Sequence, residues 1–330
     1  MILASSILCP IDFSESSRGA LRYAGAIASH LGARLTLLAV NDPLLGEAAE
    51  FAPGPAHLVE DTIREVEKFF LQSFEGKLQG VGDVRLEVAL GKPAPEILRV
   101  SRERGCDLIV MGSHGSTGFR KLFFGSTTER VLRETAVPVL VTHGNDPGPV
   151  QPDDVRKVVR RVLAPVDLTA ATPHQLVVAR GVAEALGLPL LLLHVIEPVR
   201  SMVAAQPRLP KVDAERKYRA ERELEAAAAS MPAVLKPEAL IAYGEPAEEI
   251  AKVATERDAG LIVMGLHSSP LMGPRMGSVT YRVLCLAHGL VLAVPPQPAP
   301  AARLNLAETP MNVPAPVTQP VTRDSAQPTN

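Results

Sequence analysis

The sequence predicts an α/β protein with two tandem copies of one domain, each built around a five-stranded parallel sheet. Short runs of branched aliphatic residues alternate with helix-length segments, which is typical of a parallel sheet with crossover helices on its faces. The same series of segments then occurs a second time along the 330-residue chain. This length suits two domains with additional segments better than one ordinary core.

The internal repeat is visible in four matched segments, whose order and spacing are kept to within a few residues. ILCPID at 7–12 recurs as VLAPVD at 162–167, LLAV at 37–40 as LLHV at 192–195, GKP at 91–93 as GEP at 244–246, and LIVMG at 108–112 as LIVMG at 261–265. We therefore divide the chain into a first domain (1–145), a linker (146–157), a second domain (158–297) and a Pro-rich tail (298–330).

The elements of the first copy follow from its apolar pattern. Helices should separate the strands, with Ser14 as the N-cap of a first helix that ends at Gly32. Pro93 suits the first position of the third helix. The strands are expected near residues 5–11, 34–40, 84–90, 107–112 and 137–142.

The second helix is predicted from apolar residues spaced by four and three, which turns one helix face towards the sheet. Before it, residues 41–56 contain three prolines and are expected to form a long loop at a strand's carboxyl end. Loops at such positions often cover ligands. The apolar helix positions are Val59, Ile63, Val66, Phe70 and Phe74.

Composition argues against several classes of partner and location. The net charge is −2 with no basic block, and aromatic residues make up 4% with no Trp, so no nucleic-acid partner is expected. No apolar run approaches the ~18 residues of a membrane span, and Asp12 interrupts the apolar N-terminus, unlike a secretory signal. The three cysteines lie far apart, as is typical of reduced thiols in a cytoplasmic protein. The tail from 298 to 330 has seven prolines and no aromatic residue, so we expect disorder.

A glycine-rich loop is the strongest functional signal in the sequence. In the stretch 111–127, MGSHGSTGFRKLFFGST, two residues separate Gly112 from Gly115, and nine separate Gly115 from Gly125. Backbone amides without a neighbouring Cβ can approach phosphate oxygens, and a helix N-terminus adds unpaired donors and partial positive charge. No Gly-Lys-Ser or Gly-Lys-Thr occurs, so the loop is not a P-loop. The structural alternative is that these glycines only turn a strand into a helix.

The spacing of these glycines, followed by Ser126, resembles the phosphate-binding signature of the universal stress protein family. The resemblance covers nearly all of residues 1–297. It implies two tandem doubly wound domains with strand order 3-2-1-4-5 and a ligand beyond the carboxyl ends of strands 1 and 4. It also implies an adenine nucleotide as ligand, ATP before ADP or AMP, with or without Mg²⁺.

The same resemblance assigns a contact to each matching residue of the first copy. The ligand role of Asp12 has an alternative, because Asp-x-Ser before an apolar periodic run also caps helices. By resemblance, Asp12 contacts the ribose or adenine, and the backbone of Val40 contacts the adenine. Gly112 and Gly115, beside Met111, line the ribose-phosphate turn, and the phosphates are held by Gly125, Ser126 and Thr127.

Three functions fit these features: a nucleotide-binding sensor or regulator in a stress response, a slow ATPase, and a nucleotide-independent dimerisation module. A phosphoryl-transfer enzyme needs a positioned base and usually a metal. Beyond Asp12 the sequence offers no carboxylate placed for either, and no Ser-His-Asp triad is indicated. We therefore expect no catalytic residues, and at most slow hydrolysis.

The second copy departs from the signature in the loop itself. Ser268 replaces Gly115, one residue is lost before Gly277, and Pro270 and Pro274 remove backbone donors. We therefore expect nucleotide only in the first domain. The alternative is that the shorter loop holds AMP or a metal-bridged anion, with Arg275 supplying charge.

By family resemblance the last strand of each copy lies at a sheet edge, and we expect the two strands to pair with each other. Both strands are apolar, at 137–142 and 290–294, and exposed apolar edges invite pairing. This gives an intrachain pseudo-dimer. A homodimer and an unidentified protein partner remain further expectations.

Overall fold

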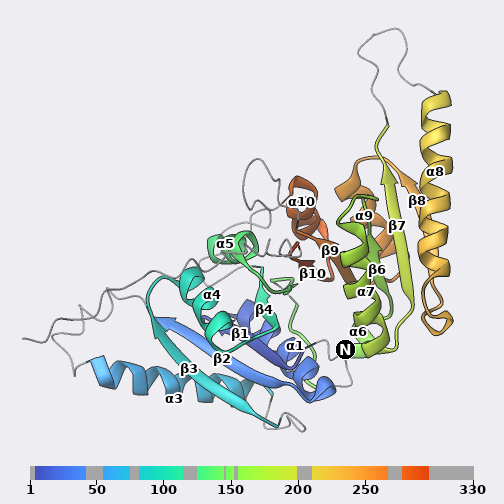
Figure 1. Cartoon of the computed structure of the whole chain (residues 1–330). Helices are drawn as coiled ribbons and strands as arrows, with labels where there is room; N and C mark the ends of the chain where they lie inside the picture. The colour runs from blue at the N-terminus through green and yellow to red at the C-terminus, as the bar shows by residue number, and fades with distance from the viewer. Residues whose placement is uncertain are drawn as a thin grey trace, which may run out of the picture. The chain divides into compact units, whose positions relative to one another are not determined.

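The computed structural model describes residues 4–41, 55–74, 82–113, 125–144, 146–151, 155–198, 210–266 and 277–296 (Figure 1). Residues 1–296 belong to one compact unit. The predicted disordered tail at 298–330 lies outside the described residues, as does most of the predicted loop at 41–56.

The strands form one ten-stranded sheet in the order β3-β2-β1-β4-β5-β10-β9-β6-β7-β8. Read within each half, this is the predicted order 3-2-1-4-5, which is confirmed together with the doubly wound α/β fold. The first half contains β1 (Ser6–Ile11), β2 (Arg34–Asn41), β3 (Val84–Leu90), β4 (Leu108–Gly112) and β5 (Val139–Thr142), and the second β6 (Val162–Pro165), β7 (Leu190–Ile196), β8 (Glu238–Tyr243), β9 (Leu261–Gly265) and β10 (Leu290–Val294).

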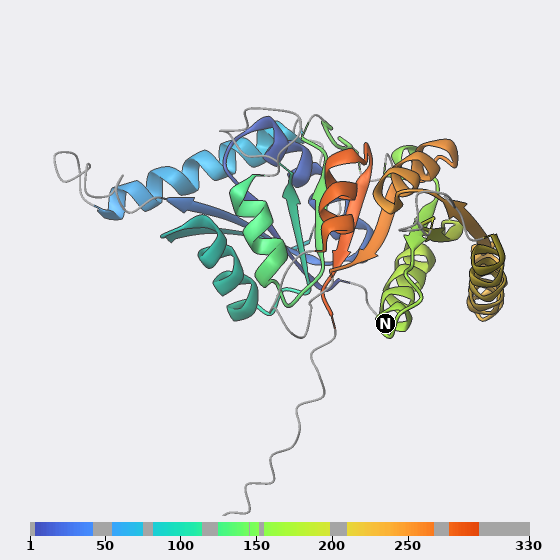
Figure 2. The same cartoon turned by 90° about the horizontal axis from the view of Figure 1, so that it is seen from above.

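Helices cover both faces of each half-sheet, because successive strand residues point to opposite sides. Ile7 belongs to one apolar core and Leu8 to the other. Figure 2 shows α1 and α3 on one side of the first half's strands and α4 and α5 on the opposite side. The helices are α1 (Glu15–Leu31), α3 (Pro55–Ser73), α4 (Pro93–Glu103), α5 (Ser126–Glu134), α6 (Val155–Val158), α7 (Thr172–Leu186), α8 (Pro210–Ala229), α9 (Pro246–Glu256) and α10 (Ser278–Leu286), with a 3₁₀ turn η3 (Ala233–Leu235).

The predicted ends of α1 are confirmed. Ser14 is its N-cap, and the Ser14 hydroxyl accepts a hydrogen bond of 3.2 Å from the amide of Ser17. At the other end Gly32 adopts the left-handed conformation, with a φ of 63°, which glycine adopts without steric cost. Pro93 begins α4, also as predicted.

Helix α3 differs in detail from its prediction. The helix begins at Pro55, so the last two residues of the predicted loop belong to it. Its buried face follows Thr62, Val66 and Phe69, whereas the predicted Phe70 is only half-buried. The reason is a contact that periodicity does not reveal, since the ring of Phe69 packs edge-on against Phe13, with 5.6 Å between centroids.

The two halves join through their last strands, as the sequence predicts. β5 and β10 are antiparallel, and Leu140 lies opposite Leu292 in the register. Residues 146–148 of the predicted linker lie against α1. The Tyr23 hydroxyl donates a 2.7 Å hydrogen bond to Asp146, and Arg22 donates one of 3.0 Å to the carbonyl of Pro147. The linker also contains the short helix α6.

Candidate functional site

A cleft of about 250 Å³ opens in the first half where β1 and β4 separate. These neighbouring strands pair only near their beginnings, at Ile7 with Leu108 and Leu8 with Ile109. Their carboxyl ends therefore diverge, which is the switch-point geometry at which open α/β sheets bind ligands.

Every predicted site residue that the structure describes lines this cleft. Gly115 lies in the stretch 114–124, outside the described residues, and its predicted role is untested. The cleft also has lining residues that sequence reasoning did not single out, among them Pro10, Ser17 and Thr128. The predicted residues on its wall are Asp12, Val40, Met111, Gly112, Gly125, Ser126 and Thr127.

One end of the cleft is the N-terminus of α5. Gly125 is the N-cap and has no side chain to accept from the amides of the first turn. Those donors thus suit the oxygen atoms of an anion. The turn is fixed from both sides, since the amide of Gly125 donates to Ser113 O at 3.0 Å and the Thr128 hydroxyl donates to Gly112 O at 2.9 Å.

Gly112 has a packing role that the sequence did not reveal. A Cβ added there would lie 2.2 Å from the Ser16 hydroxyl oxygen and 3.1 Å from the Ser16 carbonyl carbon. A side chain at this position would force α1 away from the end of β4. The packing of α1 against the end of β4 therefore favours glycine at residue 112.

Asp12 orders the turn between β1 and α1. Its Oδ1 accepts hydrogen bonds from the Ser14 amide at 3.1 Å and the Ser14 hydroxyl at 2.5 Å. The structural alternative for Asp12 thus holds, while its exposed side chain also lines the cleft. The next residue, Phe13, has a φ of 63°, a conformation that non-glycine side chains adopt at some cost. No feature of residue type indicated this strained position.

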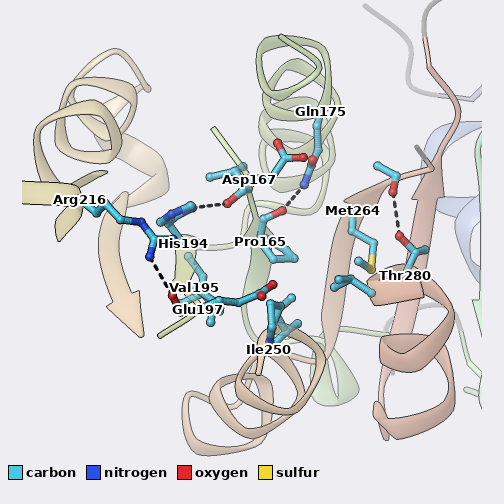
Figure 3. A pocket seen from close by; sticks show the side chains of 15 residues that line it. Pro165, Asp167, Gln175, His194, Val195, Glu197, Arg216, Ile250, Met264 and Thr280 are labelled. Carbon is cyan, nitrogen blue, oxygen red and sulfur yellow. Dashed lines mark hydrogen bonds between the residues drawn. The ribbon is translucent and has the colours of Figure 1, made fainter. Parts of the chain in front are cut away.

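The second half has a cleft of about 450 Å³ at the matching place, bounded by the same turn geometry and hydrogen bonds (Figure 3). Asp167 Oδ1 accepts from the Thr169 amide at 3.0 Å, and Leu168 repeats the positive φ, at 58°. The Thr280 hydroxyl donates to Gly265 O at 3.0 Å, as Thr128 does to Gly112 in the first half. The predictions on Ser268, Pro270, Pro274 and Arg275 lie outside the described residues.

The lining of the second cleft differs. Gln175, at the position of Ala20, donates to Pro165 O at 2.6 Å (Figure 3). It also donates to Val263 O at 3.0 Å, and so bridges β6 and β9. His194 stands where the first half has Ala39, and Arg216 reaches the cleft from α8.

The cysteines are free, as expected, and burial raises the pKa of Cys9 and Cys106. Among the described residues, no group of three or more His, Cys, Asp or Glu side chains is placed to hold a metal ion. In the same part of the chain, no helix has the length and apolar character to cross a membrane.

Comparison with known proteins agrees with this architecture. The model of the universal stress protein family matches residues 4–143 and again 159–295. Universal stress protein MJ0577 of Methanocaldococcus jannaschii is 30% identical over 158 residues, which cover 42% of this chain and 95% of that protein. Universal stress protein MJ0531 of the same organism is 32% identical over 142 residues, 42% of this chain and 82% of that protein.

A solved structure shows the same fold over nearly the whole chain. The crystal structure of a universal stress protein from Archaeoglobus fulgidus covers 88% of this chain and 98% of its own, with a TM-score of 0.58 and 22% identity. The two family matches together include most residues of both halves. The chain therefore belongs to the universal stress protein family and carries two domains of that family in tandem.

Proposed function

We propose that the first half binds an adenine nucleotide, with ATP as the favoured ligand, and that the bound nucleotide regulates the protein in a stress response. The observation that carries this proposal is the convergence of Asp12, Val40 and the Gly125–Thr127 turn on one cleft at the strand switch point. These groups come from three separate places in the chain. The family resemblance assigns Asp12 to the ribose or adenine, Val40 to the adenine and the Gly125–Thr127 turn to the phosphates.

The chemistry of the cleft fits such a ligand. Its floor is apolar, with Leu38, Ile97 and Met111, which suits a flat base. Its far end presents the glycine-capped start of α5, which suits phosphate oxygens. Asp12 is an acceptor for ligand hydroxyl or amino groups. A bound Mg²⁺ would offset phosphate charge.

A regulatory ligand fits better than a substrate. Asp12 is the one carboxylate among the described residues of the first cleft, and its Oδ1 is already engaged by Ser14. Turnover well below ~1 per second is therefore expected. The three free cysteines are consistent with action in the cytoplasm. Because β5 and β10 already pair with each other, a homodimer or a protein partner would use other surfaces.

The test is calorimetric titration of the full chain with ATP, ADP and AMP. Gly115→Val adds a side chain where the loop backbone must approach phosphate, and should weaken ATP binding more than tenfold, about 1.4 kcal/mol. Gly118→Val is the matched control, because it lies in the same loop outside the signature spacing. Equal ATP affinity in the parent and Gly115→Val would refute the proposed phosphate site.

A further inference from the structure

We propose that the second half carries a binding site of its own, between β7 and α8, for a small polar metabolite that has hydroxyl or amino donors and a single anionic group. The site is a cleft of about 460 Å³ whose wall includes His194, Arg216 and Arg219. It is independent of the nucleotide site proposed for the first half.

This cleft opens towards α8 and shares Asp167, His194 and Arg216 with the 450 Å³ cleft of the second half. Leu190 and Leu192 of β7 belong to the core under α7 and α8, and Leu191 and Leu193 to the core under α9 and α10. Because strand side chains alternate, His194 continues the first series and Val195 the second. His194 therefore faces α8, whereas Val195 occupies the position of the predicted adenine contact Val40.

The first half fills the corresponding space with aromatic side chains. Phe13 packs against Phe69 of α3, and the guanidinium of Arg18 lies 4.4 Å from the centre of the Phe69 ring. In the second half the repeat places Leu168 at the position of Phe13 and Pro173 at that of Arg18. Leu168 lines the open cleft instead. At these two positions the second half thus has smaller side chains, and Leu168 lies beside the open cleft.

His194 is held in one orientation. Its Nδ1 lies 2.8 Å from the carbonyl oxygen of Val166, and a carbonyl oxygen only accepts hydrogen bonds. Nδ1 therefore carries the hydrogen, and Nε2 of the neutral ring is an acceptor. Since His194 is only half-buried and lines the cleft, Nε2 suits a hydroxyl or amino group of a ligand.

Arg216 supplies the cation of the site. One of its terminal nitrogens donates to the carbonyl of Glu197 at 2.9 Å (Figure 3). Asp213 lies 3.6 Å from the same nitrogen. The guanidinium has five N–H donors, so this contact orients the group while other donors suit an oxyanion. Arg219, also on α8, lines the same cleft.

The charges around the cleft define the ligand class. Asp167, Glu215 and Glu223 are acceptors facing the same space as Arg216 and Arg219. An anion with several charged groups would be repelled by these carboxylates, and a neutral apolar molecule would offer the charged groups no hydrogen bonds. A ligand with several donors and one carboxylate or one phosphate satisfies both sets.

The experiment is calorimetric titration of the full chain with three probes that share a six-carbon polyhydroxy skeleton: glucose, gluconate and glucose 6-phosphate. At least one charged probe should bind with a dissociation constant below about 1 mM, and glucose at least tenfold more weakly. Which charged probe binds more tightly decides between a carboxylate and a phosphate.

Two variants on one helix locate the binding. Arg216→Gln should weaken the charged probe at least tenfold, whereas Arg222→Gln, on the same helix next to Tyr218, should change its affinity less than twofold. His194→Ala should weaken glucose and the charged probe alike. Thermal melting of each variant checks folding, and Arg216→Lys serves as the replacement if Arg216→Gln does not fold.

Three results would overturn the proposal. In the first, neither charged probe binds with a dissociation constant below about 1 mM. In the second, the parent and Arg216→Gln bind the charged probe equally tightly. In the third, saturating ATP displaces the bound probe. The last result would mean that the probe occupies a nucleotide cleft.

Discussion

The clefts at the strand switch points of the two halves have the same surrounding backbone geometry but different lining side chains. In both halves an aspartate orders the turn after the first strand, the next residue has a positive φ, and a threonine hydroxyl fixes the fourth helix to the fourth strand. The sequence differs at three matched positions, Ala39 and His194, Ala20 and Gln175, and Phe13 and Leu168, and of these residues His194 and Gln175 line the second cleft. Local hydrogen bonds thus keep the backbone geometry of the two halves alike, while the side chains that line the two clefts differ.

The largest expected effect comes from separating the two halves. Leu140 and Leu292 lie opposite each other in the β5–β10 ladder and are buried. Replacing both with Asp would bury two like charges side by side, which should cost more than about 4 kcal/mol of stability. Denaturant unfolding should then show two transitions, one for each half, or aggregation. Leu140→Ala with Leu292→Ala is the control, and a single transition at parental stability in the Asp variant would show that the halves do not depend on this junction.

A second prediction concerns nucleotide stoichiometry. If the loop differences matter, the intact chain should bind one ATP, with the second half at least a hundredfold weaker, about 3 kcal/mol. Calorimetric titration gives the number of sites, and Gly115→Val should remove the tight one. Ser268→Gly restores one glycine to the second loop and should gain affinity only in part, since both prolines remain. Two sites within tenfold of each other in the parent would contradict the one-site reading.

The smallest expected effect on stability comes from a side-chain hydrogen bond that α1 makes in the first half and that the matching residue of α7 cannot make. Tyr23 donates to Asp146 at 2.7 Å, whereas the repeat places Val178 at the matching position of α7. Tyr23→Phe should cost about 1.5 kcal/mol, because it removes a hydrogen bond to a charged group. Tyr218→Phe, whose side chain is 62% exposed, should change stability by less than about 0.5 kcal/mol.

The same tyrosine predicts a dependence on pH. Burial, followed by the hydrogen bond to Asp146, raises the pKa of Tyr23 in the folded protein. The neutral ring therefore stabilises the fold fully below the ordinary tyrosine pKa of about 10, and this contribution is lost as the pH rises towards the folded value. Parent stability should fall above about pH 10 more steeply than that of Tyr23→Phe. Parallel pH profiles of the two proteins, measured by denaturant unfolding, would contradict this assignment.

Much of the fold could be predicted because it depends on local pattern and on repetition. The helix ends at Ser14, Gly32 and Pro93 are set by neighbouring residues, and the strand order followed from the family resemblance. The buried face of α3 differs from the predicted one because Phe69 contacts Phe13, which is more than fifty residues away in the chain. The periodicity of apolar residues shows which helix face is apolar, but not which side chain each residue contacts in the folded protein.

The candidate site was predictable only in part, for the same reason. The glycine spacing indicated the cleft, but the contact of Gly112 with Ser16 needs the packing of α1 on β4. His194 and Arg216 gave no signal, because they come from a strand and a helix on either side of residues 199–209 and match no motif. Their proximity arises from strand alternation and helix placement together.

The antiparallel β5–β10 junction has a consequence for how the protein behaves on dilution. Two separate chains would have to meet in solution before their last strands could pair, so pairing would depend on protein concentration. Here both strands belong to one polypeptide, and tethering gives each an effective concentration for the other on the order of millimolar. The pairing of the halves is therefore a unimolecular property, which should persist at any expression level.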